Sequence, residues 1–249
     1  MNVLEIDNVT KRFGSLVAVG GVSIAVAKGE LRAIIGPNGA GKTTFFNLIS
    51  GFFPPSTGRI VFDGADVTLV PAHRRVELGM ARTFQVTEIF PELTVFDNLR
   101  IATEAANGHR QSFWMAREQK LKIGRLVEET LELVGLRPKA YRLVGELSHG
   151  DQRAAEIAMA LSLRPHLVLL DEPTAGMGDQ ETYEVTKLVR QLHQSGNFTI
   201  VLIEHDMRVV FHLADKISVL DRGRLLAEGT PQSIAANEAV QEAYLGKAA

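Results

Sequence analysis

Hydrophobic positions follow different periods in different parts of the 249-residue chain. Residues 1–14, MNVLEIDNVTKRFG, alternate between apolar and polar, which predicts a strand with one buried face. Residues 166–173 (HLVLLDEP) and 198–206 (FTIVLIEHD) are continuous apolar runs, typical of parallel strands that are buried on both faces. A short strand that turns at Asp63-Gly64 is predicted within 58–68, and a hairpin within 216–229.

Helical spacing replaces these strand patterns between residues 92 and 142. Asn107-Gly108 separates a first helical segment from a second one, which Gly135 ends. The second helix has one apolar face, made of Ile123, Val127, Leu131 and Val134. A further helix start is predicted at Thr230-Pro231, followed by a small helical tail.

Composition narrows the class of protein. Apolar residues make up 45% of the chain and charged residues 22%, as in an ordinary soluble domain. The net charge of −2 indicates no broad basic field and leaves only a local basic patch open, so no nucleic-acid partner is expected. Cysteine is absent, which excludes disulfides and thiolate chemistry. No apolar run approaches the roughly 20 residues of a membrane span, and no signal peptide is evident, so a cytoplasmic protein is expected.

The strongest chemical signal is GPNGAGKT, Gly36 to Thr43, between an apolar strand and a helix that stops at Gly51. It fits G-x-x-x-x-G-K-[ST] in full, the loop whose backbone N–H groups wrap nucleotide phosphates. Lys42 is expected to reach the β- and γ-phosphates, and the Thr43 hydroxyl to bind Mg²⁺. An ordinary glycine-rich turn is the disfavoured alternative. The expected nucleotide-binding residues of this loop are Gly36, Pro37, Asn38, Gly39, Ala40, Gly41, Lys42, Thr43 and Thr44.

Acidic residues follow the predicted strand LVLLDEP, where open α/β sheets bind ligands. Asp171 is expected to hold Mg²⁺ through water, and Glu172 to polarise an attacking water. A strand-end Asp-Glu pair that merely caps the next turn is the alternative, which the upstream phosphate loop makes unfavourable.

Three further residues lie near predicted strand ends. Gln85 in ARTFQ is an amide suited to contact both the metal ion and the water. His205 follows another buried strand and is expected at the same edge, where it can donate to the γ-phosphate, although a lone histidine there is more often structural. Phe13 in TKRFG is a candidate to stack on adenine, although an aromatic there is more often part of the core.

A second anion-directed helix start is predicted at residues 147–153, LSHGDQR. Ser148 and Gly150 offer a hydroxyl and a backbone donor at the start of an apolar-periodic run. The alternative is a capped surface helix without a ligand. That interpretation leaves two glycine-containing helix starts in one chain unrelated.

GPNGAGKTT, ARTFQ, LSHGDQR, LVLLDEP and EHD, in this order, resemble the ATP-binding subunits of ABC transporters from end to end. The resemblance implies an α/β fold with a P-loop nucleotide-binding core, a mostly parallel sheet, N-terminal antiparallel β elements and an inserted α-helical subdomain. The core is expected at 1–85 and 151–249, and the insertion at 86–150. The resemblance also implies that Ser148 and Gly150 bind the γ-phosphate of ATP held by an opposite subunit, in a head-to-tail dimer.

GMARTFQ (79–85), EIAMAL (156–161), DEPTAGM (171–177) and AYLG (243–246) further resemble subunits of branched-chain amino acid importers, with urea and amide importers as close relatives. The implied partners are membrane permease subunits, a second ATPase subunit (identical or a sister) and, indirectly, an external solute-binding protein. The resemblance further implies that the protein is peripherally bound at the cytoplasmic face of the cell membrane.

A lipid-exporting ABC subunit of similar size stays an alternative. A non-transport ABC protein of translation or DNA repair is disfavoured, because neither paired ATPase units nor a long coiled-coil insertion is present. A P-loop GTPase is disfavoured, because the chain has no N-K-x-D motif.

The chain departs from the usual family pattern at several positions. His149 and Asp151 stand in LSHGDQ where LSGGQ has Gly and Gln, and Asp151 adds a negative charge. Gly178 stands where an Asp is frequent, which puts a contact between subunits in doubt, and Phe13 replaces a Tyr.

Permease docking is expected on the insertion. Within VTEIFPELTVF (86–96) the apolar residues have no evident partner, which makes them candidates for this contact, with closure of the local core as the alternative. Gln85 is the expected hinge between the nucleotide site and this groove. The three apolar candidates are Ile89, Phe90 and Leu93.

Overall fold

The alternating N-terminal residues form an antiparallel sheet. The computed structural model describes residues 1–83, 89–107 and 117–245, and orders the strands of this sheet β2-β1-β4-β5. Asp63 and Gly64 have φ angles of 48° and 80°, as a two-residue hairpin turn requires, which confirms the predicted turn. The strands are β1 (Asn2–Phe13), β2 (Leu16–Ala27), β4 (Thr57–Phe62) and β5 (Ala65–Asp66).

A second sheet has the order β10-β9-β3-β8-β7-β6. All its neighbours pair in parallel except β9 and β10, which form the predicted hairpin. The expected mostly parallel sheet is therefore confirmed. Its strands are β3 (Leu31–Ile35), β6 (Met80–Arg82), β7 (Leu167–Asp171), β8 (Thr199–Ile203), β9 (Lys216–Asp221) and β10 (Arg224–Gly229).

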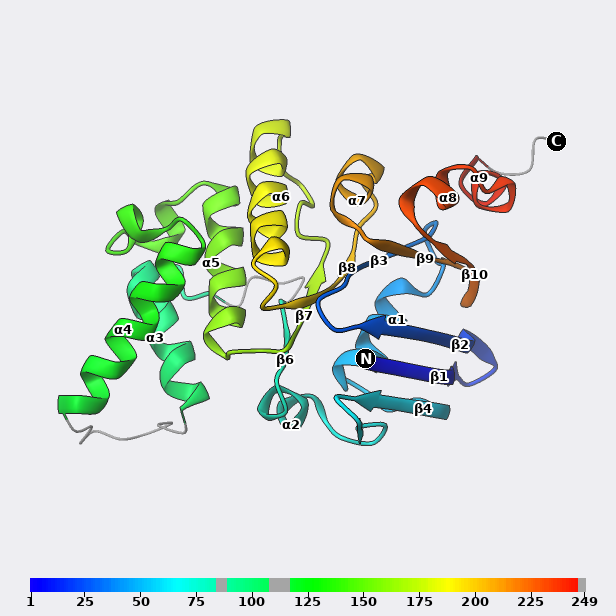
Figure 1. Ribbon diagram of the computed structural model, residues 1–249, viewed down its shortest axis with the longest axis horizontal. Coiled ribbons are helices and arrows are strands. Elements are labelled where there is room, and N and C mark those ends of the chain that lie inside the picture. The colour runs from blue at the N-terminus through cyan, green and yellow to red at the C-terminus, as the bar shows by residue number, and fades with distance from the viewer. Residues whose placement is uncertain (84–88, 108–116, 246–249) are drawn as a thin grey trace.

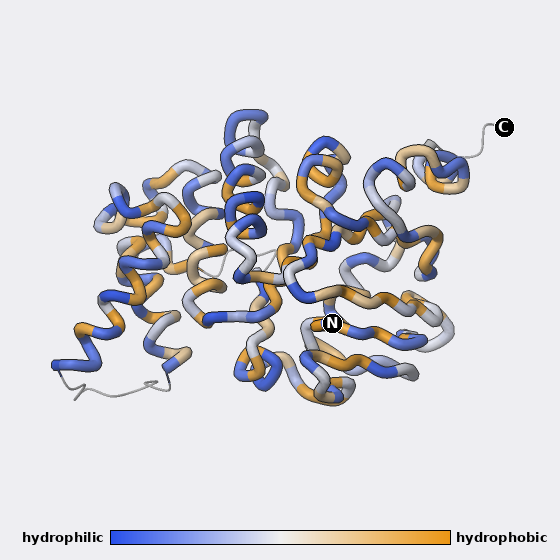
Figure 2. The backbone as a smooth tube through the Cα atoms, in the orientation of Figure 1, coloured by the Kyte–Doolittle hydropathy of each residue, from blue (hydrophilic) through white to orange (hydrophobic). Residues whose placement is uncertain are grey.

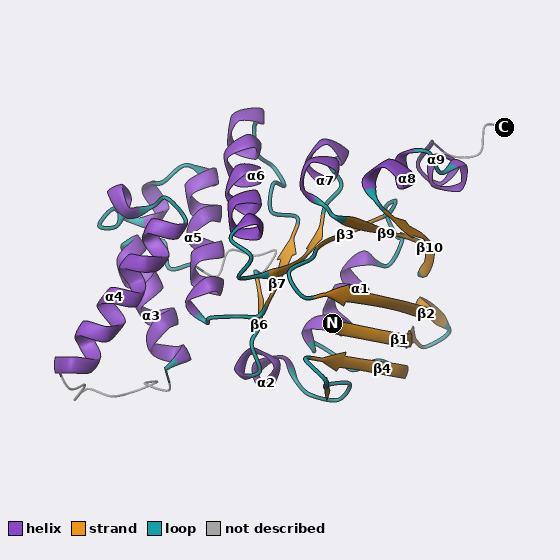
Figure 3. Cartoon of the chain, viewed as in Figure 1, coloured by secondary structure: helices purple, strands orange, loops and turns teal. Residues whose placement is uncertain are grey.

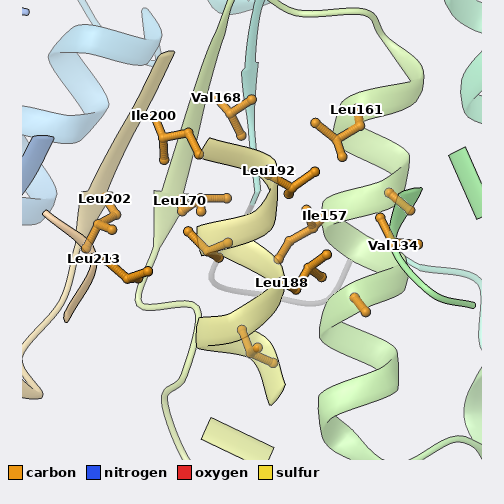
Figure 4. Close-up of a cluster of buried hydrophobic side chains, with 14 of the residues drawn as sticks. Val134, Ile157, Leu161, Val168, Leu170, Leu188, Leu192, Ile200, Leu202 and Leu213 are labelled. Carbon is orange, nitrogen blue, oxygen red and sulfur yellow. The ribbon is translucent and has the colours of Figure 1, made fainter. Parts of the chain in front are cut away.

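Burial on both faces explains the continuous apolar runs of the central strands. In β8, Ile200 and Leu202 belong to the hydrophobic cluster that packs under the helices, whereas Val201 and Ile203 belong to a second cluster. Figure 4 shows Leu188 of α6 (Asp179–Gln194) facing α5 (His149–Ser162), beside Ile157, on the side of α6 away from the sheet. The second cluster also includes apolar residues of helix α1 (Lys42–Ser50) and of the N-terminal sheet. Because neither face of these strands is exposed to solvent, their sequences do not alternate between apolar and polar residues.

Helices lie over the outer face of the six-stranded sheet and at one end of the molecule, as Figures 1 and 3 show. Gly51 ends the first helix in the left-handed conformation, and Thr230 caps the eighth, both as predicted. The helices are α1 (Lys42–Ser50), α2 (Ala72–Glu77), α3 (Val95–Ala106), α4 (Arg117–Leu133), α5 (His149–Ser162), α6 (Asp179–Gln194), α7 (Met207–Leu213), α8 (Pro231–Ala235) and α9 (Glu238–Leu245), with 3₁₀ turns at Arg137–Lys139 and Val144–Glu146.

Helices α3, α4 and α5 follow β6 in the chain and pack together before β7 begins. The predicted apolar face of α4 is buried, and hydrophobic and hydrophilic residues alternate along this helix in Figure 2. The division expected between residues 150 and 151 falls in the first turn of α5, and that between 85 and 86 lies outside the described residues. The two-part division of the chain therefore stays a prediction.

Candidate functional site

The glycine-rich loop between β3 and α1 is shaped by close backbone packing. Gly36 and Gly41 have φ angles of 154° and 93°. A Cβ atom on Gly36 would lie 2.1 Å from the carbonyl oxygen of Leu220, and one on Gly41 would lie 2.5 Å from that of Ala18. Side chains at these two positions are therefore excluded. The loop is pressed against β9 and β2, while its tip, residues 38–39, is exposed.

Lys42 opens α1 and folds back over this loop. Its Nζ donates to the carbonyl oxygens of Gly36 at 2.7 Å and Pro37 at 3.2 Å. Burial lowers the pKa of the Lys42 ammonium, and the Glu172 carboxylate opposes that shift. Thr43 is exposed at the start of the helix. The helix start therefore presents an ammonium, a hydroxyl and backbone N–H groups, a set that suits a phosphate chain.

Asp171 is the last residue of β7 and is linked to the second half of α1 through Arg82. Its side chain is 1% exposed, and its Oδ2 accepts from Nη2 of Arg82 at 2.8 Å. The other carboxylate oxygen, Oδ1, is buried without a hydrogen-bond partner in the described part of the chain. A buried oxygen in this state is costly unless another group, such as a cation or water, satisfies it.

Glu172 and His205 meet at the carboxyl edge of the sheet. Glu172 has a positive φ of 44°, and its backbone N–H donates to the carbonyl oxygen of Ile203 at 3.0 Å. The Nδ1 of His205 lies 3.6 Å from Oε1 of Glu172, and the histidine side chain is 60% exposed. The structure therefore brings these two predicted residues together, with the imidazole reaching solvent.

A buried carboxylate orders the backbone around this pair. Glu204 is fully buried and accepts from the backbone N–H of His205 at 2.9 Å and from the hydroxyl of Thr174 at 2.5 Å. It thereby ties the segment after β8 to the segment after Glu172. Sequence reasoning missed this role, although Glu204 stands in the quoted EHD.

Two arginines were also missed by the sequence analysis. Arg153 of α5 donates to the carbonyl oxygens of Asp171 at 2.6 Å and Glu172 at 2.9 Å, and so joins the LSHGDQR helix to the end of β7. Arg82 holds the Asp171 side chain. A signal was available for each, because Arg153 ends LSHGDQR and Arg82 lies within ARTFQ.

Phe13 lies at the end of β1 in an aromatic group rather than alone. Its ring makes an edge contact with Phe53 at a centroid distance of 5.6 Å, and Nζ of Lys11 lies 5.3 Å from its centroid. The Phe13 side chain remains 48% exposed, so the residue is accessible to a planar ligand. Stacking on adenine stays a prediction.

The LSHGDQR segment starts α5 with Ser148 as its cap. The Ser148 hydroxyl oxygen accepts from the backbone N–H of Asp151 at 3.2 Å. The backbone N–H of Gly150 donates to Oε1 of Glu181 on α6 at 3.3 Å. Ser148, Gly150 and Asp151 line a cavity of about 660 Å³ between α4, α5 and α6, whereas His149 lines a separate cavity of about 160 Å³ beside Asp171 and Glu172.

The departures from the family pattern have distinct surroundings. Asp151 forms an ion pair with Lys139, which offsets its negative charge. Gly178 precedes α6 with no side-chain cap, and a Cβ atom there would meet nothing within 4 Å. Space alone therefore does not require glycine at this position.

Two expectations concern the segment after β6. Gln85 lies outside the described residues, so its contacts to metal and water stay a prediction. Ile89 was expected to lack a partner, and this is wrong: it is 8% exposed and belongs to the cluster formed with α3, α4 and α5. Leu93 is half-buried, and Phe90 is 46% exposed. Ile89 is therefore part of the core, whereas almost half of the Phe90 surface is exposed.

Residues 19–175 match the family model described as ABC transporter. The chain belongs to the ABC transporter family. Residues 224–249 of this ABC subunit also match a model described as branched-chain amino acid ATP-binding cassette transporter.

Relatives of this ABC subunit match over nearly its full length. The high-affinity branched-chain amino acid transport ATP-binding protein BraF of Pseudomonas aeruginosa is 39% identical over 254 residues, which cover 99% of this chain and 98% of that protein. The corresponding protein LivG of Escherichia coli K12 is 38% identical over 252 residues, with the same coverage.

Solved structures agree with the fold. A nucleotide-free ATP-binding cassette from an ABC transporter superposes with a TM-score of 0.85 at 31% identity, covering 99% of this chain and all of that one. An ATP-binding cassette in its ADP conformation gives the same score, identity and coverage.

The chain is accordingly an ATP-binding, ATP-hydrolysing subunit of a transporter. Subunits of this family work with membrane permease subunits and with a second ATP-binding subunit. No helix in the described ranges of this chain has both the length and the apolar character that crossing a bilayer requires.

Proposed function

We propose that this subunit hydrolyses ATP to drive the import of branched-chain or closely related amino acids. The matches of residues 224–249 and of the full-length relatives support this solute class. The subunit acts at the cytoplasmic face of the membrane, bound to permease subunits, while an external solute-binding protein delivers the solute. The observation that carries the ATPase chemistry is Oδ1 of Asp171, which has no hydrogen-bond partner among the described residues. Asp171 precedes Glu172, whose carboxylate interacts electrostatically with Lys42 of the phosphate loop.

Mg²⁺ fits this site by its donor chemistry. Magnesium binds through few carboxylates and keeps several waters, and a single buried carboxylate oxygen beside an exposed threonine hydroxyl suits it. Asp171, Thr43 and Gln85 would hold the ion, directly or through water. When bound, it would neutralise charge on the β- and γ-phosphates.

Hydrolysis is assigned to the groups at the carboxyl edge of the sheet. Glu172 accepts a proton from the attacking water, a role that typically contributes about 10²–10⁴-fold to the rate. His205, 3.6 Å from that carboxylate, donates to the γ-phosphate and keeps it in line with the water. Lys42 and the backbone N–H groups of residues 38–44 hold the phosphates, and Phe13 stacks on the adenine.

Two subunits complete each other's sites in this proposal. Ser148 and Gly150 line a cavity that Lys42 and Thr43 do not line, which supports their use by a phosphate from another chain. The two chains face head to tail, so that ATP lies between the phosphate loop of one and the α5 start of the other. Binding of ATP then joins the subunits, and hydrolysis releases them.

The permease contact is assigned to a groove at the edge of the helical layer and to the exposed Phe90, which follows the groove residue Ile89 in the chain. A cavity of about 150 Å³ lies between β6, α3 and α5, and its mostly apolar lining suits a short helix of a membrane partner. It begins at Arg82 and Thr83, next to the segment that contains Gln85. Its lining is Arg82, Thr83, Ile89, Ala102, Glu156, Met159, Ala160 and Leu163.

Uptake by the assembled transporter tests the solute class. The subunit is purified with its permeases, reconstituted into vesicles with the cognate binding protein, and supplied with labelled leucine, urea or acetamide. Leucine uptake that needs ATP and is lost with Lys42→Ala is the expected result. Uptake of urea or acetamide in preference to leucine would replace the proposed solute and leave the ATPase assignment intact.

A further inference from the structure

Arg82 ends β6 and reaches two other parts of the nucleotide site. Its Nη2 donates to Oδ2 of Asp171 at 2.8 Å. Its Nη1 donates to Oδ1 of Asn47 at 2.6 Å and to Oγ of Ser50 at 2.9 Å, both on α1. The guanidinium carbon lies 5.2 Å from the centroid of the Phe46 ring. One planar group therefore links the end of β7 to the helix that follows the phosphate loop.

The two oxygens of Asp171 are treated differently by this contact. The Asp171 side chain is 1% exposed and that of Arg82 is 11% exposed, so both charges are removed from water. An ionised carboxylate at this depth is strongly unfavourable unless an opposite charge compensates it. Arg82 supplies that charge at Oδ2 and leaves Oδ1 without a partner in the ranges that the structure describes.

We propose that Arg82 is a positioning residue for the divalent cation that accompanies ATP, an inference that rests on the proposed function. By holding Oδ2, Arg82 fixes the rotation of the Asp171 carboxylate and reserves Oδ1 for the cation. By holding Asn47 and Ser50, it fixes the carboxylate relative to α1, whose first turn carries Thr43. Residues that orient a metal ligand typically change metal affinity about 10–100-fold when they are removed.

The planar fork of arginine is needed for this arrangement. It donates to the carboxylate from one nitrogen and to α1 from the other, whereas a lysine ammonium is a single point. Lysine in this place is expected to keep the charge beside Asp171 and to lose the tie to α1. A purely structural role predicts another pattern: a lower unfolding temperature with unchanged affinity for the cation in the folded protein.

Metal binding measured apart from hydrolysis separates these roles. The affinity of Mn²⁺ for the ADP complex is measured by electron paramagnetic resonance, and the affinity of the fluorescent nucleotide mant-ADP is measured in EDTA. Arg82→Met is expected to weaken Mn²⁺ binding by about tenfold or more. Arg82→Lys is expected to weaken it less. Nucleotide affinity in EDTA is expected to stay within about twofold for both variants, since the phosphate loop is untouched.

Two further variants keep the test decisive. Arg59→Met removes an arginine–aspartate pair of 2.7 Å on the N-terminal sheet, exposed on both sides, and should change neither affinity. Ser50→Ala keeps the Asp171 pair, removes one tie to α1, and should weaken Mn²⁺ binding by a smaller factor, even where Arg82→Met fails to fold.

The proposal is overturned by wild-type Mn²⁺ affinity in the folded Ser50→Ala and Arg82→Lys variants. The proposal is also overturned if these variants lose mant-ADP affinity in EDTA by the same factor as they lose Mn²⁺ affinity. Failure of the wild-type protein to hydrolyse ATP would instead refute the proposed function, and it is measured separately.

Discussion

Oε1 of Glu181 on α6 accepts a hydrogen bond of 3.3 Å from the backbone N–H of Gly150 at the start of α5. The Ser148 hydroxyl likewise donates to Oδ2 of Asp151 at 3.0 Å, and Lys139 pairs with the same carboxylate. In the head-to-tail dimer proposed above, Ser148 and Gly150 donate to the phosphate of the opposite subunit, an arrangement called here the trans model. In the single chain, both donors are engaged by carboxylates of their own chain. A γ-phosphate from an opposing subunit has to displace them.

Removing the Glu181 carboxylate is therefore expected to favour the ATP-bound dimer. Glu181→Ala should tighten dimerisation by about fivefold for each of the two sites in the dimer, because each competing hydrogen bond is worth roughly 1 kcal/mol. Dimer content is measured by sedimentation with ATP and Mg²⁺ in a Glu172→Gln background, where ATP persists. Glu184→Ala, an exposed change one turn later on the same helix, is the matched control. A dimer no tighter than that of the control would exclude competition at Gly150.

Glu172→Gln is expected to bind ATP and to lose nearly all hydrolysis. The amide keeps the shape of the side chain but cannot accept a proton, so a rate loss of about 10²–10⁴-fold follows. Turnover is measured by phosphate release, and nucleotide affinity by titration with mant-ATP. Near-wild-type turnover at unchanged ATP affinity would remove Glu172 from its assigned role.

Phe90 and Ile89 distinguish docking from core packing. Ile89→Asp buries a charge in the helical layer and is expected to destabilise the protein by about 4 kcal/mol, since an unpaired charge in the core is among the most damaging changes. Phe90→Asp changes a side chain that is 46% exposed. It should leave the unfolding temperature and isolated ATPase close to wild type while reducing co-purification with the permeases. Full complex formation by Phe90→Asp would exclude Phe90 from the permease contact.

Local patterns were sufficient to predict the strands of the central sheet. The run HLVLLDEP is apolar without alternation because both faces of β7 are covered, and the same holds for β8. The α5 start was recognisable because Ser148 caps a periodic helix. Asp171 and Glu172 followed from their place at a strand end. Each of these features depends on residues that are neighbours in the chain.

Contacts between distant segments were not predictable in this way. Arg82 and Asp171 are 89 positions apart, and only the parallel pairing of β6 with β7 brings them together. The burial of Ile89 depends on the packing of α3, α4 and α5, and the segment that contains it is too short to show a period. The burial of Glu204 was not predictable either, because a glutamate after a strand is normally expected to be exposed. Its burial is explained only by the four hydrogen bonds that it accepts from Thr174, His205 and Asp206.

The trans use of α5 is testable with two defective chains. Lys42→Ala should lose its own hold on phosphate, and Ser148→Arg should block the start of α5 with an exposed, bulky cation. Each variant alone is expected to form dimers whose two sites are both defective. In a mixed dimer, the intact phosphate loop of the Ser148→Arg chain faces the intact α5 start of the Lys42→Ala chain. One complete site is rebuilt, so ATPase activity should rise above that of either parent.

The opposite assignment gives a different result in the same mixture. If Ser148 and Gly150 served the nucleotide of their own chain, every site would retain one defect, whether on Lys42 or on Ser148. Mixing would then restore no activity, because exchange of partners could not separate the two lesions. Formation of mixed dimers is verified with differently tagged chains purified in sequence. Absence of recovery in such verified dimers would reject the trans model, whereas recovery requires that each phosphate loop use the helix start of its neighbour.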